Sequence, residues 1–146
     1  ADIEYLDAKL STFPKVDLMV IDYLTLLEGK LYKTVWERVG DVTVKVRTLA
    51  RKYCIPCLTA VQVRREAISN RKEFYEAHDI ALAFSIMQHS DIVFSMKIDD
   101  PEVLEAAPIC LLKCKFLKNR DGERTSFVLH ANFETFKVEE LKVEGS

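Results

Sequence analysis

Several positions in this sequence place a polar or charged side chain where it could act on a phosphate group. The first is Asp22, which directly follows the apolar run VDLMVI. A carboxylate at that point loses hydration unless solvent or a cation compensates for it. A Mg²⁺ ion bound to phosphate is such a cation. An aspartate that only caps an ordinary strand end is the alternative interpretation.

Gln62 and the pair Lys118 and Arg120 are the other candidates. Gln62 ends the apolar run CLTAV, and an amide there can hydrogen-bond a terminal phosphate or the attacking water. Lys118 and Arg120 stand just before Asp121-Gly122, which predicts a tight turn, and cations on an ordered turn suit phosphate. Taken alone, Gln62 is explained more simply as a solvated turn residue. Lys118 and Arg120 are explained more simply as part of a solvated hairpin tip.

Positive charge is concentrated in residues 64–72. This segment holds four cations in nine residues: Arg64, Arg65, Arg71 and Lys72. Such a segment can lie along a nucleic-acid backbone. Glu66 interrupts it and Glu73 follows it, so a solvated polar loop is an equally good interpretation.

The composition of the 146 residues excludes several classes of protein. Hydrophobic residues make up 49% and charged residues 30%, which indicates one globular domain rather than a disordered or fibrous chain. The net charge of −2 excludes a globally basic nucleic-acid binder, though not a local basic patch. No apolar run reaches the roughly 18 residues of a membrane span, so we expect no membrane partner.

Glycine is scarce, which limits the nucleotide chemistry of the chain. The four glycines are Gly29, Gly40, Gly122 and Gly145. No two have the spacing of GxxxxGK[ST] or GxGxxG, so the chain holds no complete phosphate-binding loop. The sequence begins at Ala1 rather than Met, from which we expect a processed or excised piece.

Four cysteines form two closely spaced pairs, Cys54 with Cys57 and Cys110 with Cys114. A zinc or redox site could be built from them. Both pairs lie in or beside apolar stretches that predict buried strands, where a free cysteine acts as a small hydrophobic residue. We therefore expect structural cysteines in a reducing, intracellular compartment, and keep a metal or redox protein as an alternative.

Two helices are predicted in the first part of the chain. Residues 3–12 have apolar side chains at helical spacing, and Pro14 ends the segment. Thr34 and Glu37 form a capping box for a second helix of about five turns. Its apolar face repeats every three or four residues: Val35, Val39, Val42, Val46, Leu49 and Tyr53. Alternating valines in residues 42–46 would also suit a strand, but the helical pattern is much longer.

Short apolar runs predict strands at residues 16–21, 57–61, 91–98 and 108–116. The remaining expected elements are antiparallel strands at 125–130 and 133–138, a helix from Asp79 to Gln88 and a brief helix from Asp100. Together they predict an α/β fold with a mostly parallel sheet flanked by helices and an antiparallel C-terminal end. Ligands bind beyond the carboxyl ends of parallel strands, so Asp22 and Gln62 should share one sheet edge.

In combination, these motifs are more specific than each is alone. The order VDLMVIDYL, LARKYCIPCLTAVQVRR, DIALAFSIMQHSDIVFSM and FLKNRDGE resembles the RecA-type ATPase domain of DnaB-family replicative DNA helicases, phage-encoded members in particular. The likeness runs over residues 16–138. The sequence departs from the family at residues 81–84, which are ALAF where RESG is common, and at Val61, where serine is common.

The resemblance implies a role for each candidate residue. Asp22 would be the Walker B ligand of Mg²⁺, and Gln62 the sensor of the ATP γ-phosphate. Lys118 and Arg120 would be the finger pair that reaches the nucleotide of a neighbouring subunit. The loops after Asp22 and Gln62 would contact single-stranded DNA in the channel of a hexameric ring. Primase or other replisome proteins would be partners, in the cytoplasm of a bacterial or phage-infected cell.

The resemblance also implies that residues 1–146 are the C-terminal portion of one motor domain with a partial RecA-type P-loop fold. The family's Walker A loop and catalytic glutamate precede the Walker B strand, so this chain alone should not hydrolyse ATP. The Walker A strand would lie between the strands at 57–61 and 91–98. We expect upstream sequence, a partner chain or altered strand pairing to fill that gap.

Two further classes of function stay open at this point. A RecA-type recombinase or a helicase-loader ATPase would share the fold. A non-catalytic RecA-like scaffold or interaction module would need no phosphate-binding loop, which this chain lacks.

Overall fold

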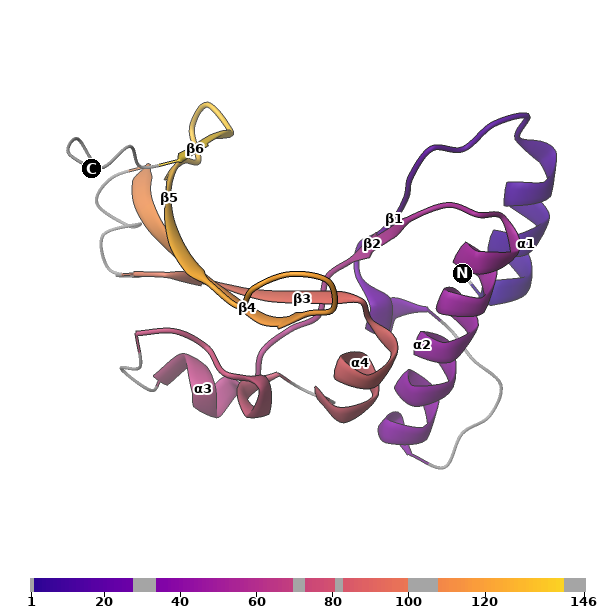
Figure 1. The fold of residues 1–146 in the computed structure, drawn as a ribbon, viewed down its shortest axis with the longest axis horizontal. Helices are drawn as coiled ribbons and strands as arrows, with labels where there is room; N and C mark the ends of the chain where they lie inside the picture. Colours follow the sequence, from indigo (N-terminus) through magenta and orange to yellow (C-terminus); the bar gives the residue numbers. More distant parts are fainter. Residues whose placement is uncertain (1, 28–33, 70–72, 81–82, 100–107, 141–146) are drawn as a thin grey trace. The chain divides into compact units, whose positions relative to one another are not determined.

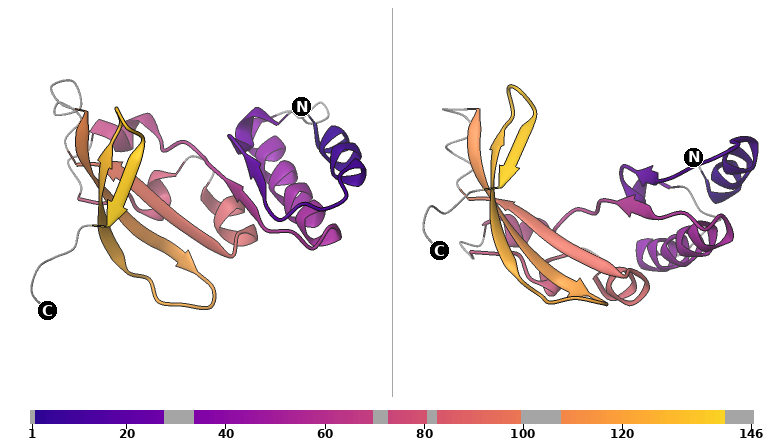
Figure 2. Two further views of the ribbon diagram at one scale, coloured as in Figure 1. Left: turned by 90° about the horizontal axis from the view of Figure 1, so that it is seen from above. Right: turned by 45° about the horizontal axis from the view of Figure 1, so that its top comes forward.

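The computed structural model describes residues 2–27, 34–69, 73–80, 83–99 and 108–140. The chain divides into two compact units (Figures 1 and 2). Unit 1 comprises Ala1–Arg64 and Ile80–Ser90, and unit 2 comprises Arg65–Asp79 and Asp91–Ser146. It stays a prediction that the two units belong to one motor domain.

In unit 1, helix α1 (Ile3–Thr12) confirms the helix predicted at residues 3–12. It begins at Asp2, whose carboxylate accepts the backbone N–H of Tyr5 at 2.8 Å. This contact satisfies one of the amide groups that a helix start leaves unpaired. The helix ends at Phe13, whose extended backbone leads into Pro14.

Helix α2 (Val35–Lys52) confirms the predicted capping residue, because Thr34 Oγ1 accepts the N–H of Glu37 at 3.2 Å. The residues buried on its apolar face are Val39, Val42, Val46 and Leu49. Val44 is 42% exposed, which excludes the alternating burial of a strand. The predicted face is too long at both ends, since Val35 is exposed and Tyr53 is the C-cap.

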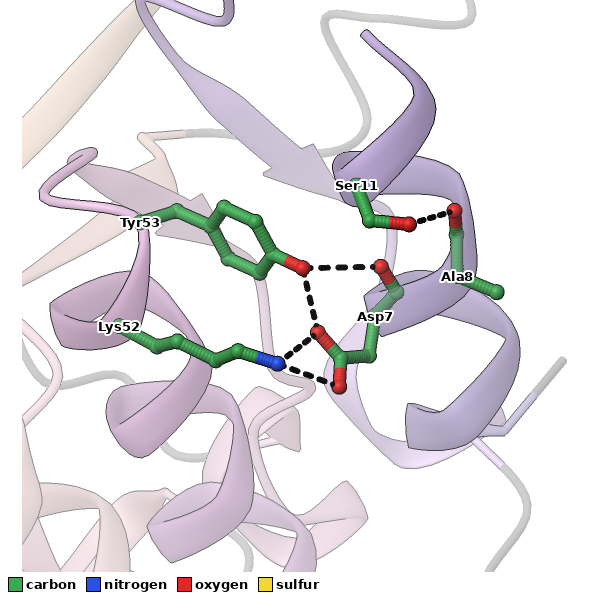
Figure 3. A network of polar contacts seen from close by, with 5 residues as sticks. All are labelled: Asp7, Ala8, Ser11, Lys52 and Tyr53. Atoms are coloured by element: carbon green, nitrogen blue, oxygen red, sulfur yellow. Dashed lines mark hydrogen bonds and ion pairs between the residues drawn. The ribbon is translucent and has the colours of Figure 1, made fainter.

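A polar network joins α1 to the end of α2 (Figure 3). Lys52 Nζ lies 2.7 and 2.8 Å from the two carboxylate oxygens of Asp7. Tyr53 donates its hydroxyl to Asp7 Oδ1 at 2.6 Å. These contacts hold the pKa of Asp7 below its usual value of 3.8, the hydrogen bond from Lys52 contributing most. The network therefore fixes how α1 lies on α2 within unit 1.

Strands β1 (Met19–Ile21) and β2 (Cys57–Thr59) form a parallel pair, shorter than the predicted 16–21 and 57–61. Met19 and Ile21 are buried, but Val20 is 61% and Leu58 51% exposed. Burial on both faces, expected from the continuous apolar runs, is therefore wrong for the described residues. A short helical turn, η1 (Leu24–Leu26), follows β1.

Helix α4 (Ala83–His89) packs against α2 and completes unit 1. The sequence predicts this helix from Asp79 to Gln88, and the structure begins it later. Asp79 instead ends a separate turn in unit 2, η2 (Ala77–Asp79). Its buried carboxylate accepts the N–H of Glu76 at 2.8 Å, so it stabilises that turn and not the helix.

Unit 2 contains a four-stranded antiparallel sheet in the order β3-β4-β5-β6. Its strands are β3 (Ile92–Ile98), β4 (Ile109–Asn119), β5 (Ser126–Asn132) and β6 (Lys137–Glu140). The sheet is strongly twisted in both figures. On one face, Ser95 donates its hydroxyl to the Tyr75 carbonyl at 3.1 Å, and Lys115 pairs with Glu76 at 2.6 Å.

The opposite face carries an aromatic row across three strands. The ring centroids of Phe94 and Phe116 lie 6.0 Å apart, and those of Phe116 and Phe127 lie 5.7 Å apart. These tilted contacts link β3, β4 and β5 beyond their backbone hydrogen bonds.

The predicted antiparallel C-terminal end is confirmed, but a mostly parallel sheet is wrong. Among the described residues, only β1 and β2 pair in parallel, whereas β3 pairs antiparallel with β4. Burial along β3 alternates, as expected for an antiparallel strand with two different faces. Since β2 and β3 belong to separate sheets, nothing here contradicts the expected gap, and its occupant stays a prediction.

The remaining differences concern the ends of elements. Strand β4 continues past the predicted end at residue 116 to Asn119. The strand predicted at 133–138 is shifted to β6, which begins at Lys137 and ends at Glu140, because Asn132 Oδ1 accepts the N–H groups of Glu134 and Thr135 and holds a turn before it. The brief helix expected from Asp100 lies outside the described residues.

Candidate functional site

The parallel pair of unit 1 brings Asp22 and Gln62 to one edge. In its register, Ile21 lies opposite Thr59, so Asp22 and Gln62 both follow the carboxyl ends of the pair. Two cross-strand contacts hold this edge. Thr59 Oγ1 donates to the Ile21 carbonyl at 2.8 Å, and the Leu24 N–H donates to the Ala60 carbonyl at 3.2 Å. The shared edge expected from the sequence is thereby confirmed.

Asp22 is accessible to a metal ion. Its side chain is exposed, so water hydrates it and a cation can approach. The peptide bond from Asp22 to Tyr23 is cis. Among the described residues, no group of three or more metal-ligating side chains could hold a metal. One exposed carboxylate fits Mg²⁺ that takes its other ligands from phosphate oxygens and water.

Gln62 is also exposed, three residues beyond the end of β2. Its amide can both donate and accept a hydrogen bond. An exposed amide and an exposed carboxylate at one sheet edge can therefore contact a phosphate and its counter-ion together.

Lys118 and Arg120 lie in unit 2, at the end of β4. Lys118 is on the strand, opposite Val93, and Arg120 is the first residue after Asn119. The Arg120 N–H donates to the Asp91 carbonyl at 3.0 Å, and its guanidinium forms an ion pair with the Asp91 carboxylate. The arginine is therefore held at a defined place beside β3.

The chain bends at Asp121-Gly122, but the connection is wider than the predicted tight turn, because β4 and β5 pair only as far as Lys115 and Ser126. Asn119 Nδ2 donates to the Glu123 carbonyl at 3.1 Å and so closes the turn. A Cβ atom at Gly122 would lie only 2.5 Å from Asn119 Nδ2. A side chain at position 122 would therefore push aside the Asn119 amide that closes the turn, at the small cost of moving the end of one flexible side chain.

The basic segment contains more regular structure than a loop. Arg64 is exposed, and its neighbour Val63 forms a β-bridge with Ile80 in unit 1. Arg65 is the first residue of helix α3 (Arg65–Ser69), in which Ala67 is buried. Arg71 and Lys72 lie outside the described residues. The structure therefore places only two of the four predicted DNA-contacting cations.

The cysteines differ from one another. Cys110 and Cys114 are buried on β4 and Cys57 is half-buried, and burial raises the pKa of each thiol. A raised pKa keeps a thiol protonated and unreactive near neutral pH. Cys54 is exposed between α2 and β2, so the expectation that it acts as a buried hydrophobic residue is wrong.

Sequence reasoning missed two residues that support the candidate positions. Thr59 ties β2 to the carbonyl just before Asp22, and Asp91 holds Arg120. The hydroxyl of Thr59 within an otherwise apolar strand was a usable signal. Nothing local marked Asp91, because its partner lies 29 positions further along the chain.

Comparison with known families identifies the chain. A model of the DnaB-like helicase C-terminal domain matches residues 2–140. The chain belongs to this family. The resemblance drawn from the helicase motifs is thus confirmed, while phage origin stays a prediction.

Two solved structures are similar to this helicase-family chain. The ATPase domain of G40P matches with a TM-score of 0.80 and 19% identity, over 97% of this chain and 52% of that one. A DnaB-like replicative helicase, described with its interactions with primase, matches with a TM-score of 0.72 and 18% identity. That match covers 89% of this chain and 33% of the other.

At these identities, the two structures show the α/β fold alone, and the chain spans about half of one and a third of the other. No curated protein matches the sequence. None of the described helices combines the length and hydropathy that crossing a bilayer requires.

Proposed function

We propose that this chain is the C-terminal part of the motor of an ATP-dependent replicative DNA helicase. The observation that carries the proposal is the shared edge of Asp22 and Gln62, in a chain that matches the DnaB-like family over residues 2–140. In an open α/β sheet, this edge is where a nucleotide binds.

Each candidate residue has a distinct task in this proposal. Bound MgATP supplies the phosphoryl group that is transferred to water. Asp22 holds and orients the metal, and Gln62 hydrogen-bonds the terminal phosphate or the attacking water. Lys118 and Arg120 stabilise negative charge that develops in the site of a neighbouring subunit.

The remaining parts of the proposal follow from the family. Six motor domains form a ring that translocates on single-stranded DNA and separates the duplex. Arg64, Arg65, Arg71 and Lys72 contact the DNA backbone, where positive charge is favourable. One similar helicase is described with primase, which makes primase a candidate partner in the cytoplasm of a bacterial or phage-infected cell.

A second candidate function is a non-catalytic interaction module with the same fold. The lack of a GxxxxGK[ST] loop in this chain favours it. Sequence upstream of Ala1 decides between the two, because a phosphate-binding loop there would complete the enzyme. A RecA-type recombinase or loader would be identified by strand exchange or loading without unwinding.

Single substitutions in a longer protein that contains this chain and a phosphate-binding loop test the enzyme. Arg120→Ala should lower DNA-stimulated ATP hydrolysis by about 10³-fold or more and leave nucleotide binding intact. Asp22→Asn should abolish hydrolysis through loss of the metal ligand. Turnover close to the wild-type rate in Arg120→Ala would remove this arginine from the site.

A further inference from the structure

Arg120 is attached to the start of strand β3 by two separate contacts. Ile92 lies opposite Asn119 at the end of the β3–β4 ladder, so Asp91 and Arg120 face each other one position beyond it. The Arg120 N–H donates to the Asp91 carbonyl at 3.0 Å, and the Asp91 carboxylate forms an ion pair with the guanidinium. Backbone and side chain are thus fixed by the same residue.

The ion pair leaves the guanidinium accessible. The Arg120 side chain is 44% exposed and the Asp91 side chain 60% exposed. A guanidinium has five N–H donors, and one carboxylate engages at most two of them well. The remaining donors are open to a second acceptor, such as a phosphate oxygen.

The turn beyond Arg120 limits movement on its other side. Asn119 closes this turn onto Glu123, and Gly122 leaves room for the Asn119 amide. The backbone of Arg120 is therefore held from both directions, and only the long side chain would be mobile without Asp91. Ordering such a side chain in advance lowers the entropy cost of binding an anion.

We infer that Asp91 is a positioning residue that aims Arg120 at the phosphate of a neighbouring subunit. The catalytic consequence of this inference rests on the proposed function. The ordering of the Arg120 side chain does not depend on that function and can be measured separately. Asp91 acts through Arg120 and does not itself contact the nucleotide.

The same strand offers a matched control. Asp99 directly follows β3, as Asp91 directly precedes it, and pairs with Lys113 of β4 at 2.7 Å. The Asp99 N–H also donates to the Leu111 carbonyl at 2.9 Å. Asp99→Asn therefore removes an equivalent ion pair from the same strand and leaves Arg120 untouched.

The first experiment uses the 146-residue chain and measures the ¹⁵N relaxation of the Arg120 Nε–H group. Asp91→Asn should increase its fast motion, Asp91→Glu should restore most of the order, and Asp99→Asn should change nothing. Equal mobility in wild type and Asp91→Asn would overturn the inference. If Asp91→Asn does not fold, the comparison of wild type, Asp91→Glu and Asp91→Ser decides in the same way.

The second experiment uses the helicase ring and separates the inference from the proposed function. Asp91→Asn should lower kcat for ATP about tenfold, with KM and ring assembly unchanged, because a misplaced finger weakens only the charge-stabilising contact. If Arg120→Ala has no effect, the proposed function fails. If Arg120→Ala abolishes turnover but Asp91→Asn matches Asp99→Asn, or raises turnover, the positioning role fails.

Discussion

Thr59 donates its hydroxyl to the carbonyl oxygen of Ile21 at 2.8 Å, across the parallel pair β1–β2. The two residues are register partners and the last residues of their strands. Asp22 directly follows Ile21, and the segment that leads to Gln62 directly follows Thr59. The hydroxyl thus supplements the backbone at the point where both candidate residues leave the sheet.

Thr59→Val keeps the β-branched shape and removes the hydroxyl. We expect it to lower the free energy of unfolding by about 1 kcal/mol, the usual contribution of one hydrogen bond. Urea unfolding of the chain measures this change. Thr59→Ser keeps the donor and should lose less, so an equal loss in both variants would mean that the hydroxyl is unimportant.

Thr34→Ala removes the N-cap of α2. The Thr34 hydroxyl oxygen accepts the Glu37 N–H at the start of the helix, and loss of such a cap costs about 1 kcal/mol. Urea unfolding should show this loss, whereas Thr34→Ser should remain close to wild type. A wild-type stability in Thr34→Ala would show that the cap contributes nothing to α2.

Acid should weaken the contact between α1 and α2 through Asp7. The pKa of Asp7 is lower in the folded chain than its usual value of 3.8, chiefly through the hydrogen bond from Lys52. Its stabilising effect is therefore present above about pH 4 and is lost as the pH falls through the folded pKa. Asp7→Asn should destabilise the chain at neutral pH and have a smaller effect near pH 2.

The measurement is urea unfolding of wild type and Asp7→Asn at both pH values. Asp17→Asn is the control, since Asp17 pairs with Lys15 where both side chains are nearly fully exposed, and such pairs contribute little. An Asp7→Asn effect that is the same at both pH values would contradict the assignment to the carboxylate charge.

The chain alone should not hydrolyse ATP. It has the edge that carries Asp22 and Gln62, but its four glycines form no phosphate-binding loop. Phosphate release from MgATP by the purified, monodisperse chain should equal the buffer background. Hydrolysis that disappears in Asp22→Asn would show that the chain builds a complete site without that loop.

The helices and the site edge were predictable because local chemistry determines them. Asp2 and Thr34 are cap residues ahead of sequences with helical apolar spacing. Asp22 and Gln62 follow short apolar runs, and the parallel pairing of those runs places the two residues together. Each of these features depends on a few neighbouring residues.

The direction of pairing for β3 was not predictable in the same way. Its partner β4 lies beyond residues 100–107, and the alternation of helices with short apolar runs suggested a mostly parallel sheet. The missed signal was a set of three lysines, Lys97, Lys113 and Lys115. Two of them, Lys113 and Lys115, alternate with buried or half-buried neighbours on β4. Polar and apolar residues that alternate in this way are typical of an antiparallel strand with two different faces.

The ion pair between Asp91 and Arg120 could not be inferred from the sequence either. It depends on a register in which β4 runs three residues beyond its predicted end and opposes the start of β3. Long-range pairing of this kind is set by the whole sheet and not by either residue.

Mixed rings test most directly whether Asp22 and Arg120 serve one nucleotide site from two subunits. Asp22→Asn and Arg120→Ala each inactivate the longer helicase in this account. When the two inactive proteins are mixed, some interfaces combine an intact Asp22 with an intact Arg120 from the neighbour. Random mixing in equal amounts makes about one quarter of the interfaces complete.

The measurement is DNA-stimulated ATP hydrolysis as a function of the mixing ratio. A site shared between subunits should give activity that neither variant has alone, with a maximum near equal amounts. Absence of recovery at every ratio, in rings shown to contain both variants, would contradict a site shared between subunits.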